Sequence, residues 1–201
     1  MKEQIKNKTT EVIIEKILKE PLLEHTATNL AKELKITRQA VWKALKKLSH
    51  ENFIILKSIA ETKKSANKVS LNFKNPLLDK TLSLILIKES LNYERWVENF
   101  SLLKNDSYFI ILFGSVLIDS KKANDIDIII VSKKEKFKKI DALIAKIQKT
   151  QAKKVHFIDL TEEEFNKELL NQNKAYLDAL KKGIILSGQD NFIKFITNLK
   201  R

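Results

Sequence analysis

The sequence has few of the residues that build disulfide-bonded, metal-rich or membrane proteins. It has no cysteine among its 201 residues, which excludes disulfides, zinc ribbons, iron–sulfur clusters and thiol catalysis. Its three histidines, His25, His50 and His156, are too few and too scattered for a zinc site made of histidines. Apolar runs such as Leu84–Ile87 are far shorter than the roughly 20 residues of a membrane span. The charged N-terminus has no apolar signal segment, so a cytoplasmic protein with no membrane partner is expected.

Glycine and proline are also scarce, with 3 and 2 residues. Each glycine therefore marks a place where the backbone requires one, and Gly114, Gly183 and Gly188 are informative for that reason. The chain is 43% hydrophobic and 31% charged, as in ordinary folded proteins, which excludes wholesale disorder. Its length lies between those of one and two typical domains.

Positive charge is concentrated near the N-terminus. Residues 1–75 contain 16 basic and 8 acidic residues, a net charge of +8, whereas residues 76–201 contain 22 and 17, a net charge of +5. A basic excess concentrated in a small domain is typical of a surface that binds phosphates. A solvated lysine-rich face would have the same charge, so the residue pattern has to distinguish the two.

Apolar residues at helical spacing predict two helices at the start of the chain. The first covers about Thr10–Lys19 and ends before Pro21. Its expected buried residues are Val12, Ile13, Ile17 and Leu18. Thr26 is placed to cap a second, short helix, because its hydroxyl can accept a hydrogen bond from a free N–H of the first turn.

A third helix is predicted from Arg38 to about Ser49, again with a threonine cap. Its buried stripe consists of Val41, Ala44, Leu45 and Leu48. On and beside its free face are the residues that we expect to contact DNA: Thr37, Arg38, Gln39, Trp42, Lys43 and Lys46. Two helices joined by a short turn, the second one basic, are typical of a helix-turn-helix. Trp42 can either cap the core or pack on sugars and thymine methyls in the groove.

Two short strands after the third helix predict a wing. Phe53–Lys57 and Val69–Phe73 are β-prone runs. The polar segment between them contains Lys63 and Lys64, which we expect to lie along the phosphate backbone. A three-helix module that binds another protein remains the alternative interpretation.

Residues 26–48 resemble the helix-turn-helix of winged-helix transcription regulators, and Arg38–Lys43 is similar to the corresponding segment of biotin operon repressors. The resemblance covers about residues 10–73 and implies double-stranded DNA as a partner. The family usually has glycine in the turn, where this sequence has Lys35. If the turn keeps its left-handed conformation, Lys35 is strained by about 1 kcal/mol.

The middle of the chain is predicted to be a helical connector without identifiable chemistry. Asn75-Pro76 breaks the strand pattern, and Leu77–Ile87 and Leu91–Leu103 have the apolar spacing of helices. We therefore expect a winged-helix domain over residues 1–75, a connector over 76–104 and a second domain over 105–201.

The second domain combines a glycine–serine pair with two close aspartates. A buried strand over Ser107–Leu112 is followed by Gly114 and Ser115, and nine residues later Asp125 and Asp127 open another apolar strand. A glycine and a serine at a strand end let a phosphate approach the backbone closely. The aspartates are two residues apart, so they share one face of the strand and favour a divalent cation such as Mg²⁺. The alternative is a turn followed by a solvent-facing edge strand.

This spacing of Gly114-Ser115 and Asp125-Ile126-Asp127 resembles the DNA polymerase beta-like nucleotidyltransferase superfamily, in particular its minimal nucleotidyltransferases. The resemblance covers roughly residues 107–188. It implies an NTP at Gly114 and Ser115, Mg²⁺ at Asp125 and Asp127, and nucleotidyl transfer to an acceptor. Minimal nucleotidyltransferases of toxin–antitoxin pairs transfer AMP to a toxin, so a protein acceptor such as a toxin is implied; a nucleic-acid end is the other candidate.

One departure from the superfamily affects catalysis. His156 stands where the superfamily has its third carboxylate, and Asp159, three residues on, is expected on the opposite face of the strand. Histidine can bind a metal or accept a proton, but it cannot replace the charge. An active enzyme that uses Asp125, Asp127 and His156 thus stays open beside a non-enzymatic regulator whose transferase domain senses a nucleotide or forms a homodimer. In both cases the predicted fold is α+β: a winged helix-turn-helix, a helical connector and a mixed sheet flanked by helices.

Overall fold

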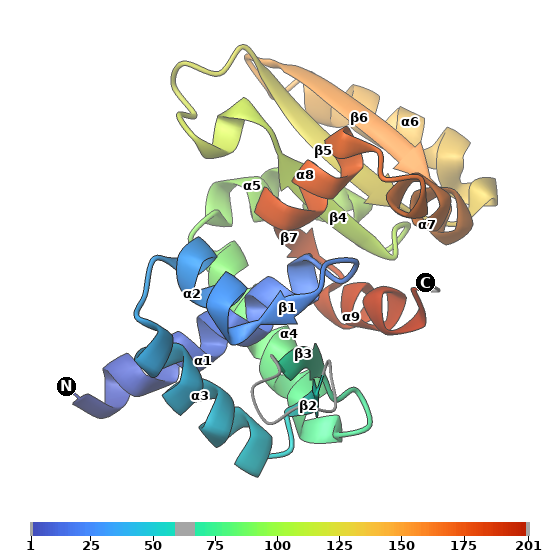
Figure 1. Ribbon diagram of the computed structural model, residues 1–201. Coiled ribbons are helices and arrows are strands. Elements are labelled where there is room, and N and C mark those ends of the chain that lie inside the picture. Colours follow the sequence, from blue (N-terminus) through green and yellow to red (C-terminus); the bar gives the residue numbers. More distant parts are fainter. Residues whose placement is uncertain (1, 59–66, 200–201) are drawn as a thin grey trace. The chain divides into compact units, whose positions relative to one another are not determined.

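The computed structural model describes residues 2–58 and 67–199. Lys63 and Lys64, which the sequence assigns to DNA contact, lie outside these residues. The chain folds into two compact units, Met1–Leu82 and Ser83–Arg201 (Figure 1). In the described part of the chain, no helix combines the length and the hydrophobicity that a membrane span requires.

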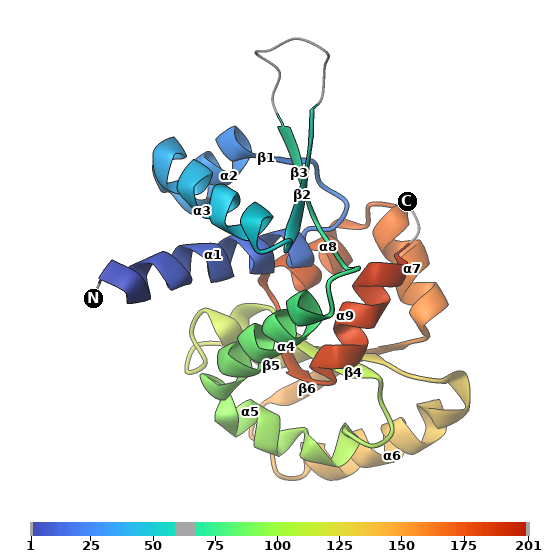
Figure 2. The same cartoon turned by 90° about the horizontal axis from the view of Figure 1, so that it is seen from below.

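The first unit consists of helices and a small antiparallel sheet (Figure 2). Its elements are α1 (Lys2–Lys19), β1 (His25–Thr26), α2 (Ala27–Leu34), α3 (Arg38–His50), β2 (Ile54–Ser58) and β3 (Asn67–Leu71). The strand order is β1-β3-β2, and Ile54 pairs with Leu71 at one end of the hairpin. The sequence predicted β2 and β3 but not β1, because a strand of two residues has no periodicity to detect.

The helices of this unit bury the faces that the sequence predicted, with one exception. Val41, Ala44, Leu45 and Leu48 of α3 are buried, as are Ile13, Ile14, Ile17 and Leu18 of α1. The prediction that Val12 is buried was wrong: it is 38% exposed, whereas Ile14 is 1% exposed. At 100° per residue Val12 projects from the side of α1 opposite to the centre of this stripe.

The caps and the turn between α2 and α3 are formed as predicted. The hydroxyl of Thr26 accepts a hydrogen bond from the Asn29 N–H, and that of Thr37 accepts one from the Ala40 N–H, both at 3.2 Å. Lys35 ends α2 with φ 54° and ψ 40°, the left-handed conformation expected of the family's glycine. The turn thus keeps its geometry with a residue that is strained there.

Helices lead from the first unit into the second. They are α4 (Pro76–Leu91), α5 (Glu94–Asn99) and the 3₁₀-helix η1 (Ser101–Leu103). The predicted single helix over Leu91–Leu103 is interrupted, because Tyr93 has φ −122° and ψ 31°, outside the helical range. Trp96, Phe100 and Leu103 are nevertheless buried, and they pack in the core of the second unit.

The second unit has a four-stranded mixed sheet with helices on both faces. Its remaining elements are β4 (Phe109–Phe113), η2 (Ser115–Leu117), β5 (Asp125–Val131), η3 (Lys134–Lys136), α6 (Phe137–Gln148), β6 (Lys154–Leu160), α7 (Glu162–Leu170), α8 (Lys174–Lys182), β7 (Ile184–Ser187) and α9 (Gln189–Asn198). The strand order is β6-β5-β4-β7, in which β5 and β6 are parallel and the other pairs antiparallel. This confirms the predicted mixed sheet flanked by helices.

The two faces of this sheet have different cores. On one face, Ile126, Ile128 and Ile130 of β5 pack with apolar residues of α5 and α6. On the other, Phe109 contacts the rings of Phe165, Phe192 and Phe195, whose centroids lie 5.4–6.2 Å away. Because β5 alternates, its aspartates at 125 and 127 lie on this second face, at the end of the strand away from the ring cluster.

Candidate functional site

The free face of α3 carries exposed polar and basic side chains. Arg38, Gln39, Lys43 and Lys46 are exposed, as is the capping residue Thr37, whereas Trp42 is half-buried at the edge of the core. The apolar stripe on the other side fixes this orientation, because rotating the helix would expose it to water. The structure thus brings together all six residues that the sequence assigned to this helix and its cap.

The cations on this face are available to bind phosphate. Across the described residues, no carboxylate pairs with Arg38, Lys43 or Lys46. Lys47, one residue further along α3, differs because its Nζ lies 3.8 Å from Glu51 Oε1. Free arginine and lysine side chains on a helix that can enter a groove can contact both base edges and phosphates.

The wing contributes a lysine that the sequence analysis did not single out. Lys57 of β2 pairs across the hairpin with Lys68 of β3, near the end at which the chain connects the two strands. Lys68 Nζ lies 2.5 Å from Glu24 Oε1, so its charge is partly neutralised, whereas Lys57 is exposed. The signal in the sequence was the position of Lys57 at the end of a strand beside a basic loop.

In the second unit, strand register brings the two aspartates and His156 together. Asp127 of β5 pairs with Phe113 of β4 on one side and with His156 of β6 on the other. His156 Nδ1 lies 3.4 Å from Asp125 Oδ2 and 3.7 Å from Asp127 Oδ1. One ligand atom from each of the three residues lies within 4.8 Å of the others, a spacing that a single cation can bridge.

Gly114 lies directly against this cluster. Its φ is 82°, and a Cβ on it would collide with the Asp127 carboxylate. Glycine is therefore required here both by the backbone conformation and by the close approach. Ser115 follows as the exposed first residue of η2, and among the described residues no hydrogen bond joins its hydroxyl to the aspartates.

The cluster is partly open to solvent, yet the pKa of one of its carboxyl groups, Asp127, is shifted. The side chains of Asp125, Asp127 and His156 are 33%, 26% and 46% exposed. Burial raises the pKa of Asp127, the neighbouring charge of Asp125 raises it further, and His156 opposes both. Two carboxylates that repel each other this closely favour a bound cation.

Asp159 does not supply the third carboxylate. As its position in the strand predicted, it lies on the opposite face of the sheet, where its Oδ1 accepts a hydrogen bond from Ser132 Oγ at 3.2 Å. Its Oδ2 is buried and has no hydrogen-bond partner among the described residues. Burial raises the pKa of Asp159 to about 6.

Several lysines near the cluster were also not singled out from the sequence. Lys154 pairs with Asp125 in the parallel register, so its exposed side chain lies on the same face as the aspartates. Lys121 is exposed in the loop before β5, and Asp119 Oδ1 accepts a hydrogen bond from its backbone N–H. Lys153 Nζ donates hydrogen bonds to backbone carbonyls of this loop. Of the three, Lys154 places an exposed positive charge on the face of the acidic cluster, where the phosphates of a bound nucleotide would need one.

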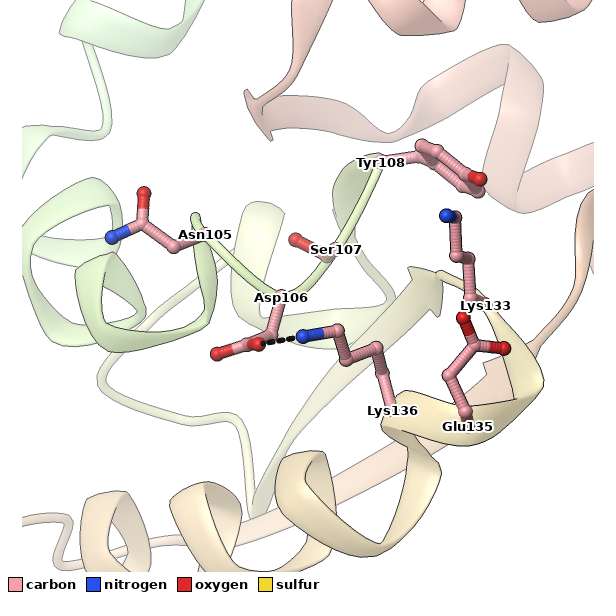
Figure 3. Close-up of a pocket in the computed structure, with 7 residues that line it drawn as sticks. All are labelled: Asn105, Asp106, Ser107, Tyr108, Lys133, Glu135 and Lys136. Carbon is pink, nitrogen blue, oxygen red and sulfur yellow. Dashed lines mark hydrogen bonds and ion pairs between the residues drawn. The ribbon is translucent and has the colours of Figure 1, made fainter.

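A separate pocket lies at the other end of β4 (Figure 3). Its volume is about 240 Å³, and it is lined by Asn105, Asp106, Ser107, Tyr108, Lys133, Glu135 and Lys136. Asp106 is bound by Lys136 at 3.0 Å and by Lys139 at 2.7 Å, and hydrogen bonds from these lysines lower the pKa of Asp106. The carboxylate thus ties the segment before β4 to η3 and α6, and the pocket shares no residue with the acidic cluster.

Comparison with known proteins matches each unit to a family. A family model described as HTH domain matches residues 9–60, and one described as nucleotidyltransferase domain matches residues 94–186. Neither the curated proteins nor the solved structures gave a significant match. The two matched regions contain, respectively, the exposed face of α3 and the cluster of Asp125, Asp127 and His156.

Proposed function

We propose that this chain, which joins an N-terminal helix-turn-helix domain to a C-terminal nucleotidyltransferase domain, binds duplex DNA and transfers a nucleotidyl group from an NTP to an acceptor. We assign residues 1–75 to the DNA-binding domain, 76–104 to a connector and 105–201 to the transferase domain. The acceptor is a protein, such as a toxin, or a nucleic-acid end.

The observation that carries the catalytic proposal is the convergence of Asp125, Asp127 and His156 beside Gly114. Three strands bring these residues together from positions up to 42 residues apart in the sequence. An ion pair with His156 would explain one close aspartate, but two aspartates packed against a glycine at a strand end fit a nucleotide–metal site better.

Each group has a defined role in this proposal. Gly114 lets a phosphate approach the strand end, with Ser115 beside it, and Lys121 and Lys154 neutralise the outer phosphates. Asp125 and Asp127 would hold a divalent cation, Mg²⁺ in the family reaction, which would supply positive charge against the phosphates. An acceptor hydroxyl oxygen forms a bond to the α-phosphorus, the bond from that phosphorus to the β-bridging oxygen breaks, pyrophosphate leaves, and the hydroxyl proton passes to water.

A non-enzymatic regulator is the second candidate function, and His156 favours it. With Asp159 on the other face, the cluster contains two carboxylates rather than three. Such a site can bind a nucleotide and signal its presence, or form a homodimer interface, without activating an acceptor hydroxyl.

Thermal unfolding with nucleotide and metal tests the binding step that both candidates can share. A ligand that binds only the folded state raises the melting temperature, so NTP with Mg²⁺ or Mn²⁺ should raise it more than either alone. Asp127→Asn should abolish the rise and stabilise the ligand-free protein, because it relieves repulsion from Asp125. Asp190→Asn, an exposed aspartate of α9, is the control and should retain the rise.

Labelled NTP then separates the two functions. An enzyme incorporates label from an α-phosphate into an acceptor and releases pyrophosphate, and Asp127→Asn abolishes both. A regulator shows the melting shift without incorporation. A melting temperature of the wild-type protein that no combination of NTP and metal changes would contradict the proposed nucleotide site.

DNA binding is tested on the full chain with duplex DNA at low and high salt. The logarithm of the affinity should fall with the logarithm of the salt concentration, at about −0.9 per phosphate neutralised. Lys63 and Lys64 of the wing stay predictions, and changing both to alanine should weaken binding to all sequences alike. The absence of duplex affinity at low salt would make the first unit a protein-binding module.

A further inference from the structure

We propose that His156 is a metal ligand and that it gives the cluster a preference for Co²⁺ or Zn²⁺ over Mg²⁺. This inference rests on the proposed nucleotide–metal site and specifies which cation occupies it. It follows from the donor atoms, their spacing and their charge.

The donor set is two carboxylate oxygens and one imidazole nitrogen. Mg²⁺ binds oxygen ligands in near-ideal octahedra and accepts nitrogen poorly, whereas imidazole is a common ligand of zinc, cobalt and other first-row transition ions. Replacing a third carboxylate by His156 removes one negative charge, and this loss reduces most the affinity for a cation that prefers oxygen ligands. The same replacement supplies the donor that a transition ion prefers.

The spacing of the donors agrees with this preference. Around a cation with ligand bonds near 2.0–2.1 Å, neighbouring ligands lie about 3.4 Å apart in a tetrahedron and about 2.9 Å apart in an octahedron. His156 Nδ1 lies 3.4 Å from Asp125 Oδ2 and 3.7 Å from Asp127 Oδ1. The two distances from Nδ1 are closer to the tetrahedral value, which zinc sites adopt most often, while all three donor atoms lie within 4.8 Å of one another and would close around a cation by side-chain rotation.

The fold already holds the three donors together. Asp127 and His156 are paired residues of the parallel strands β5 and β6, so their side chains leave the sheet on the same face. Asp125 is two residues along the same strand. The cluster can therefore close on a cation by small side-chain rotations, and Nδ1 of His156 faces the carboxylates rather than solvent alone.

Titration of the metal-free full-length protein with each cation, without nucleotide, tests the inference. Calorimetry should show Co²⁺ and Zn²⁺ binding at least about 10-fold more tightly than Mg²⁺, and bound Co²⁺ should give visible absorption of a low-symmetry nitrogen–oxygen site. His156→Ala should reduce Co²⁺ affinity about 10-fold or more and leave Mg²⁺ affinity nearly unchanged. His156→Asp should do the reverse and raise Mg²⁺ affinity.

The control is His50→Ala, which removes an exposed histidine from the end of α3 and should keep the Co²⁺ affinity and spectrum. Because His156 is half-exposed, its variants should fold, and circular dichroism checks this. Equal affinities for Mg²⁺ and Co²⁺, or Co²⁺ binding that survives His156→Ala, would overturn the inference.

The titrations contain no nucleotide, so their failure is separate from failure of the proposed function. If Mg²⁺ with NTP raises the melting temperature but Co²⁺ shows no preference, the proposed function stands and this inference fails. If Co²⁺ binds through His156 but no NTP binds, the metal site stands and the transferase proposal fails.

Discussion

The two units place their candidate functional residues in different ways. In the first unit, a single helix of 13 residues, α3, holds five of the eight side chains assigned to DNA, and one buried stripe fixes which of them face outward. In the second unit, the cluster depends on the register of β4, β5 and β6, which are far apart in the sequence. A local pattern is thus enough to define the first surface, whereas the second exists only when the whole sheet is assembled.

The largest expected effect separates the stabilities of the two units. Phe165 is fully buried and stacks on Phe195 at 5.3 Å, so Phe165→Ala should lower the free energy of unfolding of the second unit by about 3–5 kcal/mol. Leu45→Ala, in the core of the first unit, should cost that unit about 2–5 kcal/mol. Urea unfolding followed by circular dichroism, together with duplex and nucleotide binding at each step, measures both.

If the units are independent, Phe165→Ala abolishes the nucleotide response at a urea concentration where DNA affinity persists. Leu45→Ala has the opposite result. Loss of both activities together in either variant would show that the two units unfold as one, which would break the comparison.

Much of the fold was predictable because it follows from local rules. The threonine caps and the buried stripe of α3 each depend on neighbours within a turn or two, whereas the left-handed Lys35 was expected only if the turn kept the geometry of the family that it resembles. For the cluster, strand parity predicted that Asp125 and Asp127 share a face and that Asp159 lies on the other. What parity cannot give is which strand pairs with which, so Lys154 beside Asp125 and the packing of Gly114 against Asp127 appeared only in the structure.

The next largest effect concerns the recognition helix. Arg38→Ala should reduce affinity for a preferred duplex about 10-fold or more and relax sequence preference, because an arginine at the start of such a helix can pair with base edges, worth about 1–3 kcal/mol. Lys57→Ala should instead weaken all duplexes alike and reduce the salt slope by about 1. Fluorescence anisotropy with several duplexes distinguishes the two patterns.

Lys47→Ala is the matched control, since Lys47 already pairs with Glu51. We expect it to change affinity little. An Arg38→Ala variant with unchanged affinity and preference would remove α3 from the DNA interface and favour the protein-binding alternative for the first unit.

One titratable group in each unit should make the stability of that unit depend on pH, and the two dependences should have opposite signs. The folded-state pKa of Asp159 is raised to about 6, so the folded second unit binds this proton more tightly than the unfolded chain does. Stability from this group is therefore present at low pH and is lost as pH rises from about 4 through about 6. Because the side chain is partly exposed, Asp159→Asn should stabilise the unit by only about 1–2 kcal/mol at pH 7.5, and by much less at pH 4.5.

His25 in the first unit should show the reverse. Burial lowers its pKa, and its Nε2 lies 3.0 Å from the Glu20 carbonyl oxygen. A histidine whose pKa is lowered by folding stabilises the folded state at pH values above its unfolded-state pKa, near 6.5. This contribution is lost as the pH falls below that value. Urea unfolding of the wild type and of Asp159→Asn at several pH values measures how the stability of each unit changes with pH. An equal gain in stability from Asp159→Asn at pH 4.5 and at pH 7.5 would contradict the explanation from burial of the Asp159 carboxylate.

The smallest expected effect uses a feature that both units share. Lys35, after α2, and Gln172, after α7, have φ of 54° and 55°, a conformation that is strained by about 1–2 kcal/mol in any residue but glycine. A glycine would relieve this strain, but its greater conformational freedom in the unfolded chain offsets part of the gain. Lys35→Gly and Gln172→Gly should therefore each stabilise their own unit by up to about 1 kcal/mol. Lys32→Gly, inside α2, is the control and should destabilise by about 1 kcal/mol. Urea midpoints of the two units report each change, and a loss of stability in Lys35→Gly would mean that the lysine side chain, rather than the turn, decides this position.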